Sequence, residues 1–325
     1  MRSFSVFAVA MLFAATGSIG SSSAQSIAPQ AAQWSVAPSF GKGANARENI
    51  SGAACTATEP AFRSCLAIND QEKYAQLFSI TGKTIVPGAV VRLLDNSADG
   101  DPDAEGAAYD QGFFYAVGSH GLSRKKAKLT VASFLVFRFP ALSQTGKAGE
   151  IAAAVQTSSK LREAIRAAEF VGPFAEKPLN ANGANIEGIA VDAGRLYVGF
   201  RAPSLEGRAF VLSAAVDGVF GSGNLAAKVY PLALGPGRGI RDLARVDGGI
   251  LVLAGPAAEE QVPASVFLWT PSSGTLKKLA DLSGIPAGAK AETLLLLGQT
   301  PQHYDALVMF DGISNGGPVE YLIPR

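Results

Sequence analysis

The sequence is poor in charged, aromatic and sulfur-containing residues. Charged residues make up 17% of the 325 residues and aromatic residues 8%, with three Met, two Cys and two His. The 28 Lys and Arg nearly balance the 27 Asp and Glu. No cationic excess is therefore available to neutralise phosphates, and we expect no nucleic-acid partner. The chain has 48% hydrophobic residues, too many for a disordered protein, and its 36 Gly and 18 Pro indicate a turn-rich chain.

The first 24 residues have the pattern of a signal peptide. Arg2 is their only charged residue, an apolar run covers residues 4–15, and Ser22-Ser23-Ala24 matches a small-x-small cleavage site. We predict that residues 1–24 are removed and that residues 25–325 form a single domain, exported to the periplasm or secreted. The apolar run is too short for a permanent transmembrane helix, and we expect a monomer without a membrane span.

The two cysteines, Cys55 and Cys65, lie ten residues apart. In an oxidising compartment such a pair is more often a disulfide than part of a metal site, because cysteine metal sites need more ligands than two. We therefore predict a disulfide. Two separate buried thiols are the alternative, since free cysteine is among the most buried residue types.

Five short segments repeat along the chain, each with a small or acidic start. Their second positions are separated by 54, 82, 55 and 50 residues, so three of the four intervals are alike. The positions are Ser51, Glu105, Glu187, Asp242 and Glu292. Each start is followed by apolar runs separated by short Gly/Asp turns, such as Asp192-Ala193-Gly194, which is the pattern of successive β-hairpins.

Four antiparallel strands in each unit of about 50 residues predict an all-β protein, a β-propeller of about five blades. Radial stacking covers the sheet faces that a single four-stranded sheet leaves open. The last unit has residues for about three strands, and Trp34-Ser35-Val36 is our candidate for its fourth strand. The 82-residue interval leaves six blades possible.

One helix is expected within that long interval, in an insertion over about residues 146–170. Leu161, Ala164, Ile165 and Ala168 fall at helical spacing after Ser158-Ser159. Arg162, Glu163, Arg166 and Glu169 should decorate the opposite side. We expect this helix to pack its apolar stripe on the rim of the propeller.

Three segments carry a likeness to a known family. Asn185-Ile186-Glu187-Gly188 with residues 196–203, Gly239–Ala244 with residues 253–256, and Gly118-Ser119-His120 with Arg124 resemble segments of the uncharacterised bacterial domain-of-unknown-function family 3616. The likeness covers roughly residues 50–310. More loosely, the Glu-Gly start of a blade is similar to that of esterase-like, phytase-related secreted propellers. The resemblance implies an exported propeller and no established activity.

The propeller geometry predicts one rim on which functional side chains meet. The start of the first strand and the end of the second strand of each blade lie at the same face. We therefore expect a channel mouth that gathers carboxylates, guanidinium groups and one histidine. The acids are Glu105, Glu187, Asp242 and Glu292, and the other groups are His120, Arg124, Arg201, Arg208 and Arg241.

Several carboxylates close together repel unless a cation compensates. Arginines in fork geometry are one possible compensator, and calcium held by Glu105, Glu187, Asp242 and Glu292 is the other. The alternative is that these acids only tie one blade to the next through backbone amides. Residues 99–105 alternate oxygen-bearing side chains and suggest a calcium loop, although they depart from the EF-hand pattern and also fit an Asp-rich turn.

Two functions remain open. The first is binding of a small polar or anionic ligand at the mouth, with Arg124, Arg201, Arg208 and Arg241 as contacts. The second is a calcium-assisted hydrolase of phosphate or carboxylic esters, in which Glu187 and His120 are the catalytic candidates. A histidine bonded to backbone is an equally good interpretation of His120. We favour binding, because propellers host many non-catalytic roles and the fold by itself does not establish a chemical activity.

Overall fold

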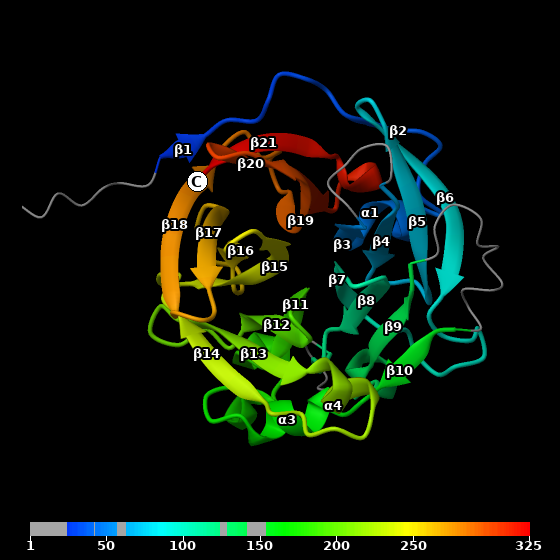
Figure 1. Ribbon diagram of the computed structural model, residues 1–325, viewed down its shortest axis with the longest axis vertical. Coiled ribbons are helices and arrows are strands. Elements are labelled where there is room, and N and C mark those ends of the chain that lie inside the picture. Colours follow the sequence, from blue (N-terminus) through cyan, green and yellow to red (C-terminus); the bar gives the residue numbers. More distant parts are fainter. Residues whose placement is uncertain (1–24, 42, 57–62, 124–128, 142–153) are drawn as a thin grey trace, which may run out of the picture.

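Five β-sheets lie around a central axis in the computed structural model, which describes residues 25–41, 43–56, 63–123, 129–141 and 154–325 (Figure 1). The first sheet is β3 (Ile50–Cys55), β4 (Cys65–Asn69), β5 (Tyr74–Thr81) and β6 (Thr84–Arg92). The second is β7 (Ala104–Asp110), β8 (Phe113–Gly118), β9 (Val136–Pro140) and β10 (Gln156–Ser158). The third is β11 (Asn185–Asp192), β12 (Arg195–Ala202), β13 (Ala209–Ala215) and β14 (Lys228–Leu232).

The last two sheets differ in the number of their strands. The fourth is β15 (Arg238–Val246), β16 (Gly249–Pro256), β17 (Ser265–Thr270) and β18 (Thr275–Leu282). The fifth is β19 (Lys290–Gln299), β20 (His303–Asp311) and β21 (Val319–Pro324). The first strand of each sheet is the innermost, and β19 contacts β3, so the ring is closed. The expectation of an all-β propeller with about five blades is confirmed.

Glycine-containing turns connect the two inner strands as the sequence indicated. In the loops Gln111-Gly112 and Ala193-Gly194 both residues have positive φ, between 45° and 86°. A two-residue hairpin with positive φ at both positions matches the right-handed twist of its strands, and glycine adopts it without steric cost.

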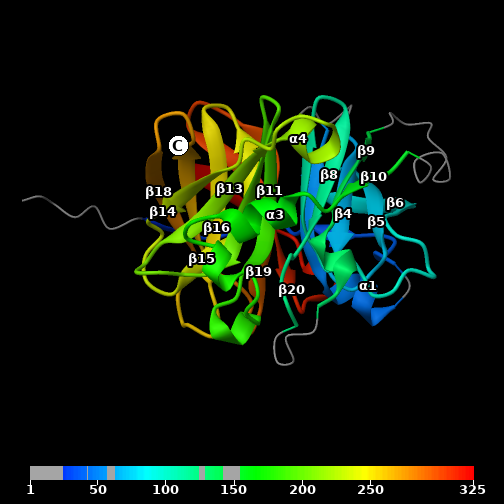
Figure 2. The same cartoon turned by 90° about the horizontal axis from the view of Figure 1, so that it is seen from below.

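The hydrophobic core is divided among the five spaces between neighbouring blades. Each of five buried clusters draws its side chains from two adjacent sheets, and the cluster that joins the last blade to the first contains Phe40, Phe78, Leu307 and Met309. A sheet that is apolar on both faces needs a partner on each side, and the ring gives every blade two partners. Figure 2 shows these stacked blades edge-on.

The amino-terminal segment closes the ring differently from our expectation. β2 (Ser35–Val36) pairs in parallel with β6 of the first blade, not with the last blade, which therefore keeps three strands. β1 (Ser26–Ile27) pairs in parallel with β18, and between the two the Gln30 amide donates to the Glu320 carbonyl. The segment thus wraps the outer edges of blades four, five and one (Figure 1). It joins three blades instead of completing one.

Helices are few and short in the part of the chain that the structure describes. They are α1 (Ala44–Glu48), α3 (Leu161–Ala167), α4 (Val216–Phe220) and the 3₁₀ turns η2 (Val131–Phe134), η3 (Gly172–Phe174), η4 (Leu179–Ala181) and η5 (Ser314–Gly316). None of the described helices is long and apolar enough to cross a membrane. The expected helix is α3, in the connection from β10 to blade three. The rest of its predicted insertion lies partly outside the described residues.

α3 buries Leu161 and Ile165 as expected, but it also buries Arg162, which we had placed on the exposed side. The Arg162 guanidinium donates to the carbonyl oxygens of His120 (2.6 Å) and Ala175 (2.7 Å). The helical spacing of the residues could not predict the burial of Arg162, because its partner His120 lies in a loop of the preceding blade. The predicted signal peptide, residues 1–24, lies outside the described residues, and the structure joins Cys55 to Cys65 in a disulfide.

Candidate functional site

Each innermost strand carries a β-bulge at the same point near its start. The register of the first two strands shifts by one residue there in all five blades. The bulged residues are Ser51, Glu105, Glu187, Arg241 and Glu292. A bulge re-aims a side chain out of the regular alternation of a strand. The equivalent position in the fourth blade is therefore Arg241, one residue before the Asp242 that our alignment had placed there.

The residue after the bulge lies against the next inner strand. A Cβ added at Gly52, Gly106 or Gly188 would come within 2.8–2.9 Å of the backbone of the following blade. This close approach explains why three of the repeats place glycine after the bulged residue.

The fourth blade has Asp242 at this position. Its carboxylate accepts the backbone amides of Leu243 and, in blade five, Leu294, both at 2.7 Å. Asp242 is 1% exposed, and burial raises its pKa well above the usual value. It ties blade four to blade five, as the alternative interpretation proposed, and does not line the cavity described below.

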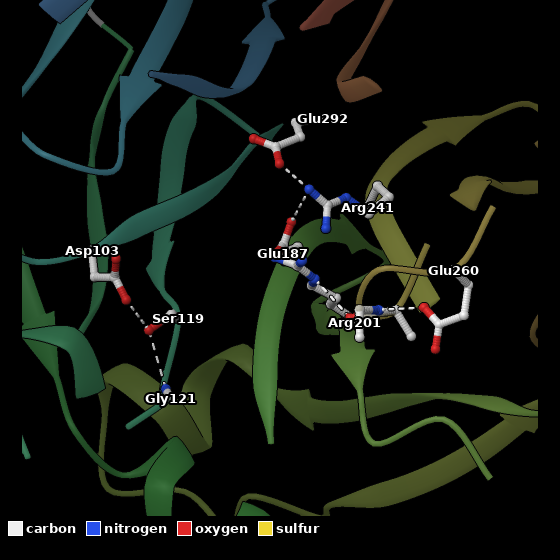
Figure 3. A network of polar contacts seen from close by, with 10 residues as sticks. Asp103, Ser119, Gly121, Glu187, Arg201, Arg241, Glu260 and Glu292 are labelled. Carbon is white, nitrogen blue, oxygen red and sulfur yellow. Dashed lines mark hydrogen bonds and ion pairs between the residues drawn. The ribbon is translucent and has the colours of Figure 1, made fainter. Parts of the chain in front are cut away.

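Two arginines and two glutamates form a buried network at the same end of the channel (Figure 3). Arg201 Nη1 contacts Glu187 Oε1 at 2.9 Å, and Arg241 Nη2 contacts Glu187 Oε2 at 3.2 Å. Arg241 also pairs with Glu292. The four charges balance, and Glu187 and Arg241 are only 3% and 2% exposed. Such a network holds its side chains in one geometry, because breaking it would leave a buried charge without a partner.

Beside this network lies a cavity of about 350 Å³ with an acidic lining. First-strand starts and second-strand ends meet here, since Glu105, Glu187 and Glu292 line the cavity together with Asp70 and Asp311. Asp101 and Asp103 add two more carboxylates, and Arg201 and Lys290 are its basic lining residues. With seven acids against two bases, the lining has a net negative formal charge, which favours a cation over an anion.

Three of these acids form a tight cluster. One carboxylate oxygen each of Asp70, Asp103 and Glu105 lies within 4.8 Å of the others. Burial, followed by repulsion from neighbouring acids, raises the pKa of Asp70 to about 7, and burial raises the pKa of Asp103 to about 6 even though Ser119 donates a hydrogen bond to it. Burial likewise raises the pKa of Glu105 well above its usual value. No ion pair to these three carboxylates occurs within the described ranges.

Two acceptor atoms of the cavity lining have no hydrogen-bond donor among the described residues. Asn185 lines the same cavity and is 8% exposed, and its Oδ1 has no partner among the described residues. Asp70 Oδ1 also has no hydrogen-bond partner among the described residues. A buried acceptor without a donor costs about 1–3 kcal/mol. The cavity therefore contains oxygen atoms that a bound cation, or water attached to one, would satisfy.

The structure keeps His120 away from the cavity. Its side chain is fully buried against Phe134, with ring centroids 5.9 Å apart, and neither ring nitrogen has a partner among the described residues. Burial, with a smaller effect of Arg162, lowers the pKa of His120 to about 3, so the ring is neutral. The residue adopts a left-handed φ of 52°, and Arg162 holds its carbonyl.

The remaining sequence candidates are scattered. Arg208 is exposed in the turn before β13 and does not line the acidic cavity, and Arg124 lies outside the described residues. Asp70, Asp103, Asn185 and Lys290 were not among our site candidates. Residues 99–105 carry the calcium-loop pattern noted above, and Asp70 directly follows β4, the second strand of the first blade. Taken together, these two features are the sequence signal for the cluster.

Comparison with known proteins gives a family and a fold. The model of a family described as a protein of unknown function (DUF3616) matches residues 61–134 and 138–316. No curated protein matches the chain.

Two solved structures illustrate the fold. A GH43 β-1,3-galactosidase solved with galactodeoxynojirimycin is 10% identical, with a TM-score of 0.50, over 91% of this chain and 94% of the other. An exo-β-1,3-galactanase from Phanerochaete chrysosporium is 11% identical, with a TM-score of 0.50, over 91% of this chain and 64% of the other. At these identities the likeness shows the propeller fold alone.

Proposed function

The chain belongs to the family of proteins of unknown function DUF3616, and we propose that it is a ligand-binding propeller whose channel mouth holds a calcium ion. The observation that carries this proposal is the cluster of Asp70, Asp103 and Glu105, whose carboxylate oxygens approach within 4.8 Å. Calcium binds six to eight oxygens at about 2.3–2.6 Å, so the oxygens around one ion lie up to about 5 Å apart. The cluster has that spacing.

The environment of the cluster supports a cation more than an anion. Two of the four arginines expected to hold an anionic ligand, Arg201 and Arg241, are matched by Glu187 and Glu292. A free anion entering the acidic cavity would meet a net negative charge. A calcium ion would instead relieve the repulsion among the acids and give Asn185 Oδ1 a positive partner. A polar ligand would then bind at the mouth by occupying the coordination positions of the ion that the protein leaves free.

The hydrolase alternative would use the same ion to polarise an ester or phosphate oxygen. It also needs a group that transfers a proton at the reacting atoms. His120, our candidate for that role, is fully buried and does not line the cavity. We therefore retain binding as the proposed function. Hydrolysis of p-nitrophenyl acetate or p-nitrophenyl phosphate that depends on calcium and is lost in Glu105→Gln would reverse this preference.

Calcium binding is tested by isothermal titration calorimetry on chelator-treated protein. We expect one site, with Asp70→Asn and Glu105→Gln each weakening calcium about 10–100-fold, the usual cost of disturbing a metal site. Asp247→Asn is the matched control, because it removes one exposed carboxylate at the opposite end of the channel. Equal affinity in parent and both cluster variants would refute the site.

We also propose that the chain acts outside the cytoplasm. The Cys55–Cys65 bond is compatible with an oxidising compartment. Calcium modules that work outside cells commonly bind with dissociation constants of about 10⁻⁴–10⁻³ M. Fractionation of cells producing the full chain tests the location: we expect the protein in the exported fraction, shortened by residues 1–24, and a full-length cytoplasmic product would contradict it.

A further inference from the structure

A second cavity, of about 580 Å³, adjoins the acidic one. Arg201 and Lys290 line both cavities, so the two meet at these side chains. The walls of the second cavity come from the segment that follows β16 and from the segment between β18 and β19. Its volume is within the range of about 300–1,000 Å³ that small-molecule sites occupy.

The inner end of this cavity is basic. Arg201, Arg241 and Lys290 all line it. The two arginines are balanced by Glu187 and Glu292, as described above. Lys290 forms no hydrogen bond or ion pair with any described side chain, and it is only half-buried, so its ammonium group is available to a ligand. Among the described residues Lys290 is therefore the basic group at the junction that has no ion-pair partner, although Asp311 is its register partner on β20 and Glu259 and Glu260 also line the second cavity.

Besides the polar side chains of Glu259, Glu260 and Gln261, the rest of the second cavity is largely apolar. Val262, Ala264, Leu282, Ile285 and Ala289 contribute its walls. Leu282 and Ala264 are buried in the protein, whereas Val262, Ile285 and Ala289 are half-buried and offer apolar surface to an occupant. A basic group at one end and this apolar wall are complementary to a molecule with an anionic head and an apolar body.

We infer that the second cavity binds the apolar body of a small amphipathic carboxylate, whose head lies at Lys290 where the two cavities meet. The inference deepens the proposed function and rests on it, because the calcium ion held by the acidic cavity would supply the second contact of the carboxylate. The adjoining acids repel anions in general. An anion without an apolar body gains only the contact of its head, so it is excluded.

The test uses the calcium-loaded full chain and the probes butanoate, hexanoate, octanoate and 1-octanol in titration calorimetry. Affinity should rise about fourfold per methylene from butanoate to octanoate, the factor expected for burying each CH₂ group. The alcohol should bind at least tenfold more weakly than octanoate, because it has no charge for Lys290. Lys290→Gln should weaken octanoate at least tenfold, while calcium should still bind with an affinity no lower than that of the parent, because the substitution removes a positive charge from the lining of the acidic cavity.

A matched pair of variants tests the location. Ala289→Phe fills the cavity from a half-buried wall position, and Ala287→Phe adds the same ring at an exposed neighbouring position outside the lining. We expect the first to weaken octanoate at least tenfold and the second to leave it unchanged. Thermal unfolding of both variants shows whether each is folded.

The outcomes separate this inference from the proposed function. If calcium binds but octanoate does not, or if affinity is independent of chain length or of Lys290, the inference is overturned and the calcium site stands. If octanoate binds with the expected dependence on Lys290 and chain length but calcium does not bind, the second cavity stands and the proposed function is refuted.

Discussion

Replacing Asp103 by Asn should make the protein more stable and less able to bind calcium. Asp103 is a cluster carboxylate with a raised pKa and a left-handed φ of 45°. Asparagine tolerates that backbone conformation, and its amide oxygen still accepts the hydrogen bond from Ser119. The substitution therefore removes the charge and keeps the local contacts.

The magnitude follows from the pKa of Asp103. Burial raises it from 3.8 to about 6, which corresponds to about 3 kcal/mol. Because the folded pKa lies above the unfolded one, this stabilisation is present below about pH 4 and is lost as pH rises through 6. At pH 8 the calcium-free parent has lost all of it, whereas the variant has no charge to lose. The variant should then be about 3 kcal/mol more stable, which raises Tm by about 5 °C for a domain of roughly 300 residues.

Calcium should remove most of this difference between parent and variant. At a concentration of about 100 times Kd, binding stabilises the parent by about 2.7 kcal/mol, or about 4 °C. The variant should gain little. The assay is thermal unfolding of both proteins at pH 4 and pH 8, with chelator and with calcium, and exposed Asp99→Asn in the same segment is the control for lost charge. A variant less stable than the parent at pH 8 in chelator, or an equal response to calcium, would refute the reasoning.

Three further predictions concern the scaffold. Gly188→Ala places a Cβ 2.8 Å from the next inner strand and should cost about 1–3 kcal/mol in chemical unfolding, whereas Gly43→Ala, with open space around it, should change little. Lowering the pH from 8 to 5 should cost the parent about 2 kcal/mol of stability, because a buried histidine with a pKa of about 3 cannot take up the proton that the unfolded chain binds below pH 6.5. His120→Asn should remove this loss, and an unchanged difference in stability between parent and variant across this range would contradict it. Replacing Cys55 and Cys65 by Ser should lower the stability by about 2–3 kcal/mol, the entropy of a loop of this length, and a reductant should then destabilise only the parent.

The order of the residues was enough to predict the propeller and the face that carries the candidate site. The repeated pattern of apolar runs and Gly/Asp turns specifies hairpins locally, and the near-equal spacing specifies repeated sheets that must stack. From this, Glu105, Glu187 and Glu292 could be placed at one mouth with Arg201, and the structure finds them around one cavity. The bulge even explains why they point there. Its exact position could not be read, so Asp242 was aligned in place of Arg241.

The folded arrangement of the side chains sets which acids pair with arginine and which lie together without a basic side chain. Glu187 and Glu292 are matched by Arg201 and Arg241, whereas Asp70, Asp103 and Glu105 come from two blades and repel one another. The order of residues cannot show this, because charge pairing depends on distances of a few ångströms between side chains far apart in the chain. The second cavity could not be predicted from the order of residues either, because its basic end and apolar walls come from two loops and from strands of neighbouring blades that meet only in the folded ring.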